Sequence, residues 1–336
     1  MKHNFCAKYG KILEICKQYS KNLVNELGNT TKRGVVPKFS DLEVIALSLT
    51  AEAMSIDSEN CLFGRLQSYK TEFPNLISRR QYNARRKKTG KLCNLIRERI
   101  ANEIDGNETY FCIDSKPIEV CRKSRASRCK LGKQNYDTAP AFGYCASQNT
   151  YYYGYKLHAV CGLSGVIHSY DITKANVHDI NYLNDVKYDY HDCAIIGDRG
   201  YISKTIQLNL FEEAKIELEV PHRLNQKNRK PIFIPYAKAI KRIETDFSQF
   251  VDQFMLNRNY AKQIEGFMTR IISKISAFTI MQYVNYSLGK PITFTDERTS
   301  VGKLSSNITI GTIYSESILH NNCKCVAMVL QCVWDK

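Results

Sequence analysis

The chain has 336 residues, of which 43% are hydrophobic and 24% charged, a balance that excludes collagen-like, low-complexity and largely disordered proteins. This length allows one large domain or two modest ones, each with its own buried core. The 48 Lys and Arg residues outnumber the 33 Asp and Glu residues and give a net charge of +15, which favours a polyanionic partner, above all nucleic acid. No segment approaches 18 consecutive apolar residues and no secretory signal is evident, so we expect a soluble, cytoplasmic protein with no membrane partner.

Residues 1–105 show helical periodicity throughout. Apolar side chains recur every three or four positions over residues 8–27 and predict a first amphipathic helix. Ser40 and Glu43 form the pattern of a capping box, which predicts a second helix over 41–53. A short third helix is expected over 59–69. We therefore predict that this region is all-helical.

A strongly basic helix is expected next, because Ser78 and Gln81 repeat the capping-box pattern. The cations that we expect to contact DNA there are Arg79, Arg80, Arg85, Arg86, Lys87 and Lys88. No acidic residue offsets them, and each neutralised phosphate releases counterions and adds sequence-independent affinity. The alternative is a solvated helix face. We interpret 1–105 as a DNA-binding region, in which the helix over 78–88 lies nearest to DNA.

From residue 106 the periodicity changes to that of a mixed α/β domain. A strand is predicted over 109–121, followed by two strands that meet in the turn Gly162–Gly165. Helices and strands then alternate, with helices over 178–186 and 205–215 and strands over 193–201 and 216–223. Two long helices fill residues 237–288. The predicted fold of 106–291 is thus an α/β mixed sheet flanked by helices, and 292–336 is a Ser/Thr-rich tail of unknown role.

Three acidic residues stand where catalytic acids occur in such sheets. Asp114 lies in the first strand, Asp198 ends the buried strand AIIGDRGY, and Glu244 lies in the later helix KRIETDF. Mg²⁺ prefers hard oxygen ligands, so two strand-end aspartates and a facing glutamate could hold two cations about 4 Å apart. Taken singly, the Asp-Gly turn and a helical Glu beside basic residues have ordinary structural explanations.

The order of these motifs along the chain also resembles that of a known protein family. The succession FCIDSKPIEVC, GYKLHAVCGLSGVIHSYDITKANVHDINYL, AIIGDRGYIS and RIETDFSQF resembles the catalytic domain of bacterial insertion-sequence transposases of the DDE type, and the insertion sequence 982 family in particular. The resemblance covers about residues 41–291. It implies an RNase H-like fold in which Asp114, Asp198 and Glu244 match the metal-binding and catalytic triad. The family pattern also includes Gly154, Lys156, His158, His178 and Asp179.

Near the triad the resemblance leaves some assignments open. Related enzymes carry an Arg four positions before the Glu and a Lys seven after it, where this chain has Ile240 and Val251. Arg242 is a candidate to replace one of these basic residues at DNA. Glu119 and Asp246 are rival acidic ligands, although Asp246 lies two positions from Glu244 and should point away from the same site.

The resemblance implies a transposase that uses two Mg²⁺, with Mn²⁺ able to substitute, to cleave element ends and join them to target DNA. Its partners would be double-stranded DNA, the terminal inverted repeats and target DNA, bound as a homodimer near the nucleoid. Further phosphate contacts are expected from Lys156 and from the basic stretch Arg122, Lys123, Arg125 and Arg128, which could otherwise be a surface loop. The alternatives are a nuclease without strand transfer, or a non-catalytic DNA-binding protein or decayed transposase copy.

Overall fold

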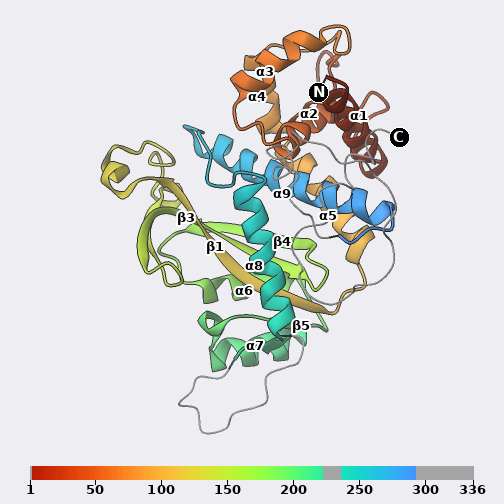
Figure 1. Ribbon diagram of the computed structural model, residues 1–336. Coiled ribbons are helices and arrows are strands. Elements are labelled where there is room, and N and C mark those ends of the chain that lie inside the picture. The colour runs from red at the N-terminus through yellow and green to blue at the C-terminus, as the bar shows by residue number, and fades with distance from the viewer. Residues whose placement is uncertain (1, 222–235, 293–336) are drawn as a thin grey trace, which may run out of the picture.

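The computed structural model in Figure 1 describes residues 2–221 and 236–292. Most of the expected tail 292–336 lies outside these residues. So does a second basic stretch over 223–230, which the sequence suggests as a further DNA contact. No helix within the two described ranges is long and apolar enough to cross a membrane.

The N-terminal region is helical, as its periodicity predicts. Its helices are α1 (Lys2–Tyr19), α2 (Asp41–Ala53), α3 (Glu59–Leu66) with the 3₁₀ turn η1 (Gln67–Tyr69), α4 (Arg79–Lys88) and α5 (Gly90–Asp105). Both predicted capping boxes are present, because Ser40 caps α2 with Glu43, and Ser78 caps α4 with Gln81. Each box satisfies backbone N–H groups that a helix start would leave without a partner, so the two starts are fixed locally.

The first helix ends earlier than its apolar pattern predicts. The expected helix over 8–27 stops at Tyr19, and Asn22 takes a left-handed φ of 64°. The side chain of Asn25 then accepts hydrogen bonds from the backbone N–H groups of Leu27 and Asn29, at 3.1 and 2.9 Å. Asn side chains offer the backbone such local alternatives to helical hydrogen bonds, and here a turn replaces the last helical residues.

A six-stranded mixed sheet forms the second part of the fold. Its strands are β1 (Tyr110–Cys121), β2 (Ala141–Cys145), β3 (Thr150–Gly162), β4 (Ile167–Lys174), β5 (Ala194–Ile196) and β6 (Glu217–Glu219). The order is β2-β3-β1-β5-β6, with β4 also paired to β3. β1 pairs antiparallel with β3 and parallel with β5. The sequence did not predict β2, because five residues at a sheet edge show too little alternation.

Helices cover both faces of this sheet (Figure 1). One face packs against α6 (Leu183–Asp189) and α7 (Lys204–Ala214), and the other against α5, α8 (Tyr236–Asp252) and α9 (Ile264–Ser287). Within β1, Phe111 and Ile113 belong to the core beneath α6 and α7, whereas Cys112 belongs to the core beneath α5, α8 and α9. This alternation is the period of two that a strand imposes. The α/β mixed sheet with flanking helices and a preceding helical region is therefore as predicted.

The core beneath α5, α8 and α9 extends across the predicted boundary between residues 1–105 and 106–291. It joins side chains of α1, α2 and α5 to those of β1, β3, α8 and α9. α9 itself packs against α2, α4 and α5 as well as against α8. The division into a region 1–105 and a domain 106–291 stays a prediction, and any hinge there would have to open this shared core.

A buried ion cluster holds the helical region to α9. Glu52 of α2 is 3% exposed and lies 2.8 Å from Arg86, 2.7 Å from Lys274 and 3.8 Å from Arg270. Burial acts to raise the pKa of Glu52, but Lys274, Arg86 and Arg270 outweigh it and hold that pKa below its usual value. The cluster thus ties α2, α4 and α9 together.

Replacing Glu52 should destabilise the protein strongly. Glu52→Gln leaves buried cations without a counter-charge, so we expect the free energy of unfolding to fall by about 3–5 kcal/mol. Urea denaturation at neutral pH measures this change. The matched control is Glu213→Gln, which removes the exposed ion pair with Lys187 at 2.7 Å and should leave the midpoint unchanged. Equal midpoints for Glu52→Gln and the wild type would contradict the structural role of the cluster.

Candidate active site

The parallel pairing of β1 and β5 brings Asp114 and Asp198 to the same end of adjacent strands. Cys112 of β1 pairs with Ile196, the last residue of β5. Asp114 and Asp198 each follow two positions later. Asp114 pairs with Ala159 of β3, a member of the core beneath α8, so its side chain faces that helix. Asp198 ends the extended chain and caps the 3₁₀ turn η5 (Arg199–Tyr201), accepting a hydrogen bond from the N–H of Gly200 at 2.7 Å.

Glu244 approaches the same region from α8. This helix packs against β1 and β5 through a buried stripe that includes Ile243, Phe247 and Phe250. Glu244 follows Ile243 directly and is solvent-exposed. The helix therefore lies on the sheet by its apolar side and keeps a carboxylate at its margin.

The acidic side chains influence one another electrostatically. Burial raises the pKa of Asp114 to about 7, and the negative charges of Asp198, Asp179 and Glu244 add to this effect, against one opposing hydrogen bond from the N–H of Ser115. The pKa of Asp198 is also raised, chiefly by burial and then by Asp179. The three predicted acids thus share one region with a fourth carboxylate, and such perturbed acids mark candidate functional sites.

Among these four acids, Asp179 is hydrogen-bonded to a lysine ammonium group and to a serine hydroxyl group. It opens the 3₁₀ turn η4 (Asp179–Tyr182), and its Oδ1 accepts hydrogen bonds from Lys156 Nζ at 2.8 Å and Ser115 Oγ at 3.0 Å. Lys156 also donates to the carbonyl oxygen of Val177 at 2.8 Å. Lys156 was expected to contact DNA, but its ammonium group is engaged inside the protein, where it holds Asp179 on the face of the sheet opposite to α8.

His158 lies two positions after Lys156, on the same face of β3, and is fully buried. Its Nε2 lies 2.8 Å from Thr173 Oγ1, and its Nδ1 is 4.0 Å from Asp179. Burial lowers the pKa of His158, with Asp179 acting in the opposite direction, so the ring is neutral at pH 7. These contacts give His158 a packing role beside Asp179.

Tyr201 is a site residue that the sequence did not single out. It is 1% exposed, and its hydroxyl group has no hydrogen-bond partner among the described residues. Burial raises its pKa, and the charges of Asp114, Asp179 and Asp198 raise it further. The ring itself packs in the core beneath α6 and α7. Gly197 makes room for this ring, since a Cβ there would lie 3.1 Å from both Tyr201 and Ile113. The only signal in the sequence was the Tyr that closes the motif AIIGDRGY.

The rival acids lie elsewhere. Glu119 is exposed further along β1 and pairs with Gly154. Asp246 is 3% exposed and faces the β3–β4 turn, where burial raises its pKa and Arg242 partly offsets that effect. Arg242 lies against Gly165 of the same turn. Neither rival is among the groups that act on Asp114.

The chemistry of this donor set suits a hard divalent cation. The four carboxylates supply oxygen ligands of the kind that Mg²⁺ and Mn²⁺ prefer. Within residues 2–221 and 236–292, no group of three or more His, Cys, Asp or Glu side chains has converged to ligating distance.

Comparison with known proteins connects this arrangement to a family. A family model described as a transposase DDE domain matches residues 105–280, which is more than half of the chain. The chain belongs to the DDE transposases. No curated protein matches the chain.

The transposase family fits the fold and gives the site its general chemistry. The mixed sheet, its helices and the N-terminal helical region are consistent with an α/β, RNase H-like transposase. Membership supports a transposase function and DNA as the binding partner, and the family generally uses divalent metal ions.

The expected DNA-contacting cations of this transposase fall into two groups. The exposed ones are Arg79, Arg80 and Lys88 on α4 and Arg122, Lys123, Arg125 and Arg128 at the turn η2 (Lys123–Arg128), with Lys87 half-buried. Arg85 instead pairs with Asp41 at 2.7 Å, and Arg86 pairs with Glu52. Proximity in sequence does not separate these groups, because the partners of Arg85 and Arg86 lie on another helix.

Because Asp114 is buried, the stability of the wild type relative to an Asp114→Asn variant should depend on pH. Because its pKa is raised from 3.8 to about 7, the folded protein binds a proton that the unfolded chain releases, and stability falls as the pH rises through this window. Asp114→Asn removes the buried charge, so without metal it should exceed the wild type in unfolding free energy by about 2–4 kcal/mol at pH 8.

Urea denaturation in EDTA at several pH values measures this difference. The gain should shrink toward pH 4, where the folded chain keeps Asp114 protonated and a large fraction of the unfolded chain is protonated there as well. A difference that stays constant between pH 4 and pH 8 would show that ionisation of Asp114 does not destabilise the fold.

Proposed function

We propose that this transposase mobilises an insertion sequence of the 982 kind, by metal-dependent cleavage of the element ends and strand transfer into target DNA. The observation that carries the proposal is the placement of Asp114, Asp198 and Glu244 on a central strand, after the end of its parallel neighbour and on the helix that covers them. The order of the four motifs quoted above supports the assignment to the 982 family.

Asp114, Asp198 and Glu244, the acidic triad, would hold two Mg²⁺, for which Mn²⁺ can substitute. When bound, the cations supply activation of water or a DNA 3′-OH and stabilisation of the leaving 3′ oxygen. The triad offsets their charge, and burial of Asp114 strengthens this attraction because water screens it less. Lys156 and Ser115 hold Asp179 on the other face of the sheet, from which its charge still acts on Asp114 and Asp198. No nucleophilic side chain is needed for this chemistry.

Double-stranded DNA would lie across the basic surfaces. The turn η2 follows β1, the strand of Asp114, and presents Arg122, Lys123, Arg125 and Arg128 to solvent. Arg122 follows Asp114 by eight positions, roughly 26 Å along an extended strand, so these cations can neutralise phosphates at a distance from the scissile bond. The exposed cations of α4 contact a terminal inverted repeat. Two ends must be brought together for transfer, so the protein acts as a homodimer on DNA.

Removing any member of the triad should abolish cleavage and leave DNA binding intact. With Mg²⁺ and a duplex that carries an element end, we expect Asp114→Ala, Asp198→Ala and Glu244→Ala to cut at least about a thousandfold more slowly than the wild type. Gel assays measure nicking, and fluorescence anisotropy measures binding of the same duplex. Glu119→Ala, an exposed acid on the strand of Asp114, is the matched control and should cut normally.

The products decide between the proposal and its alternatives. Joined end–target molecules are expected from a transposase. Hydrolysis with no joined product would indicate a nuclease, and binding without cleavage by the wild type would indicate a non-catalytic DNA-binding protein. A triad variant that cuts at the wild-type rate would remove that residue from the site.

Metal binding should also be visible without any reaction. Because a ligand that binds only the folded state stabilises it by mass action, saturating Mg²⁺ should raise the melting temperature of the wild type and EDTA should reverse the shift. Asp198→Asn should lose most of this response while retaining its fold. Equal Mg²⁺ responses in the two proteins would contradict ligation by Asp198.

A further inference from the structure

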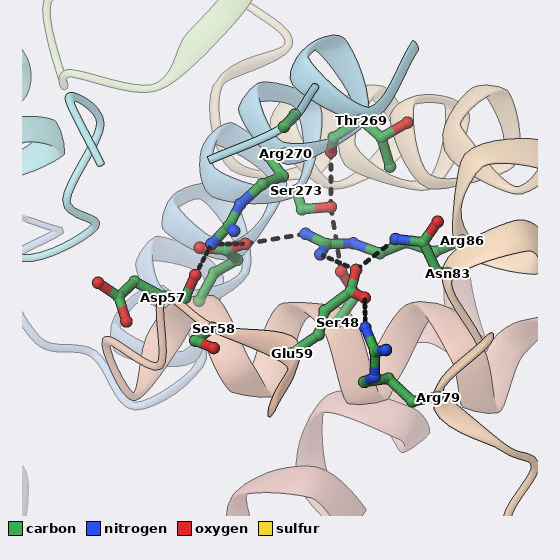
Figure 2. A network of polar contacts seen from close by, with 12 residues as sticks. Ser48, Asp57, Ser58, Glu59, Arg79, Asn83, Arg86, Thr269, Arg270 and Ser273 are labelled. Carbon is green, nitrogen blue, oxygen red and sulfur yellow. Dashed lines mark hydrogen bonds and ion pairs between the residues drawn. The ribbon is translucent and has the colours of Figure 1, made fainter. Parts of the chain in front are cut away.

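A second polar site lies away from the acidic triad, where α3 and α4 meet the segment 260–263 and the start of α9. Here a pocket of about 610 Å³ opens, and Figure 2 shows the polar network around it. The basic residues that line it are Arg79, Arg86, Lys87, Lys262 and Arg270, and the acidic ones are Asp57 and Glu59. Five cations against two acids leave the pocket with an excess of positive charge.

The helical geometry of α4 separates two sets of cations. Arg79, Asn83, Arg86 and Lys87 recur at intervals of three and four and line the pocket. Arg80 and Lys88 lie one position further along and are exposed outside its lining. One helix therefore presents positive charge both inside and beside the pocket.

The deepest cations are not fully satisfied by the protein. Arg86 and Arg270 share the carboxylate of Glu52 with Lys274, so three cations converge on one acid. Arg86 is 7% exposed, and the buried Nε atoms of both arginines have no hydrogen-bond partner among the described residues. Unpaired buried donors cost free energy, so the pairing of these two arginines within the protein is incomplete.

Glu59 is the main internal competitor for the cations of the pocket. It lies 3.7 Å from Arg86 and 4.0 Å from Arg79, and it accepts a hydrogen bond from Asn83 at 2.7 Å. Both ion pairs are long, so these guanidinium groups keep donors for a stronger acceptor. In Figure 2, Arg79 and Arg86 approach Glu59 from different sides.

We propose that this pocket binds a phosphate group of the DNA backbone. Arg86 and Arg270 supply the buried donors, and Arg79, Lys87 and Lys262 close around the anion. A polymer is favoured over a small free anion because Arg80 and Lys88 continue the positive charge outside the pocket, where neighbouring phosphates of one strand would lie. The proposal rests on the proposed DNA-binding function and locates one of its contacts on α9, outside the helical region 1–105.

Two double variants of equal charge test the pocket. Arg79→Ala with Lys87→Ala removes two cations that line it, and Lys11→Ala with Lys21→Ala removes two exposed cations that lie outside it and outside the proposed DNA contacts. Fluorescence anisotropy with a labelled duplex, in EDTA and at fixed salt, measures the affinity of the full chain. We expect the pocket pair to weaken binding about tenfold more than the control pair. Equal losses in two folded variants would overturn the proposal.

A third variant predicts a change in the opposite direction. Glu59→Gln removes a negative charge from the pocket and frees Arg79 and Arg86, while its amide can still accept from Asn83. DNA affinity should therefore rise, by about threefold to tenfold. An unchanged or lower affinity, with an unchanged melting temperature, would overturn the proposal.

Inorganic phosphate distinguishes the source of the anion. At constant ionic strength, phosphate should stabilise the wild type against heat more than it stabilises the pocket pair, because a DNA phosphate and a free one share the same donors. If phosphate does so while the two double variants lose DNA affinity equally, the pocket serves a small anion and the DNA assignment is overturned. These assays contain no Mg²⁺ and score no cleavage, so failure of the proposed catalysis would leave their outcome unaffected.

Discussion

The parallel pairing of β1 with β5 is the constraint on which the candidate active site depends. It brings Asp114 and Asp198 to the same end of adjacent strands, although they are far apart in the chain. The antiparallel partner of β1, strand β3, contributes Lys156 and His158. The face of β1 that carries Asp114 is the one covered by α8, so Glu244 reaches the same region. Each component follows from strand register and from one amphipathic helix.

This arrangement concentrates negative charge where burial makes it unfavourable. Asp114 carries the cost most clearly, because burial and three neighbouring carboxylates act together to raise its pKa. The large cores on both faces of the sheet hold the backbone in place against this repulsion. Acids that are destabilised in isolation attract divalent cations strongly, and a DDE transposase needs that attraction.

The basic residues divide between two physical roles that a net charge does not distinguish. Arg97 is 1% exposed and joins α5 to β4 by donating to the carbonyl oxygens of Ile167 and His168, at 2.7 and 3.0 Å. Arg86 and Lys274 are buried around Glu52. Cations such as these hold helices together, and the remaining exposed ones provide the surface for a polyanion. The pocket beside α4 is lined by cations of both kinds, such as the buried Arg86 and the exposed Arg79.

The sequence by itself determined the features that depend on neighbouring residues. The capping boxes at Ser40 and Ser78 fixed two helix starts, strand periodicity gave the mixed sheet, and the order of the motifs gave the family that the comparison confirmed. The roles of Asp114, Asp198 and Glu244 stay predictions. The early end of α1 escaped prediction because asparagine side chains compete there with helical hydrogen bonds, and β2 because an edge strand of five residues carries little pattern.

Only the tertiary structure decided which charged groups are available. Arg85 and Arg86 are indistinguishable in sequence from Lys88, yet their partners Asp41 and Glu52 lie on another helix. The contact of Lys156 with Asp179 and the pocket shared by α4 and α9 likewise join distant segments. Burial and ion pairing are set by packing between such segments, whereas sequence patterns record mainly local geometry. For this reason the sequence identified the DDE transposase family, and the fold determined which charged side chains are paired and which are exposed.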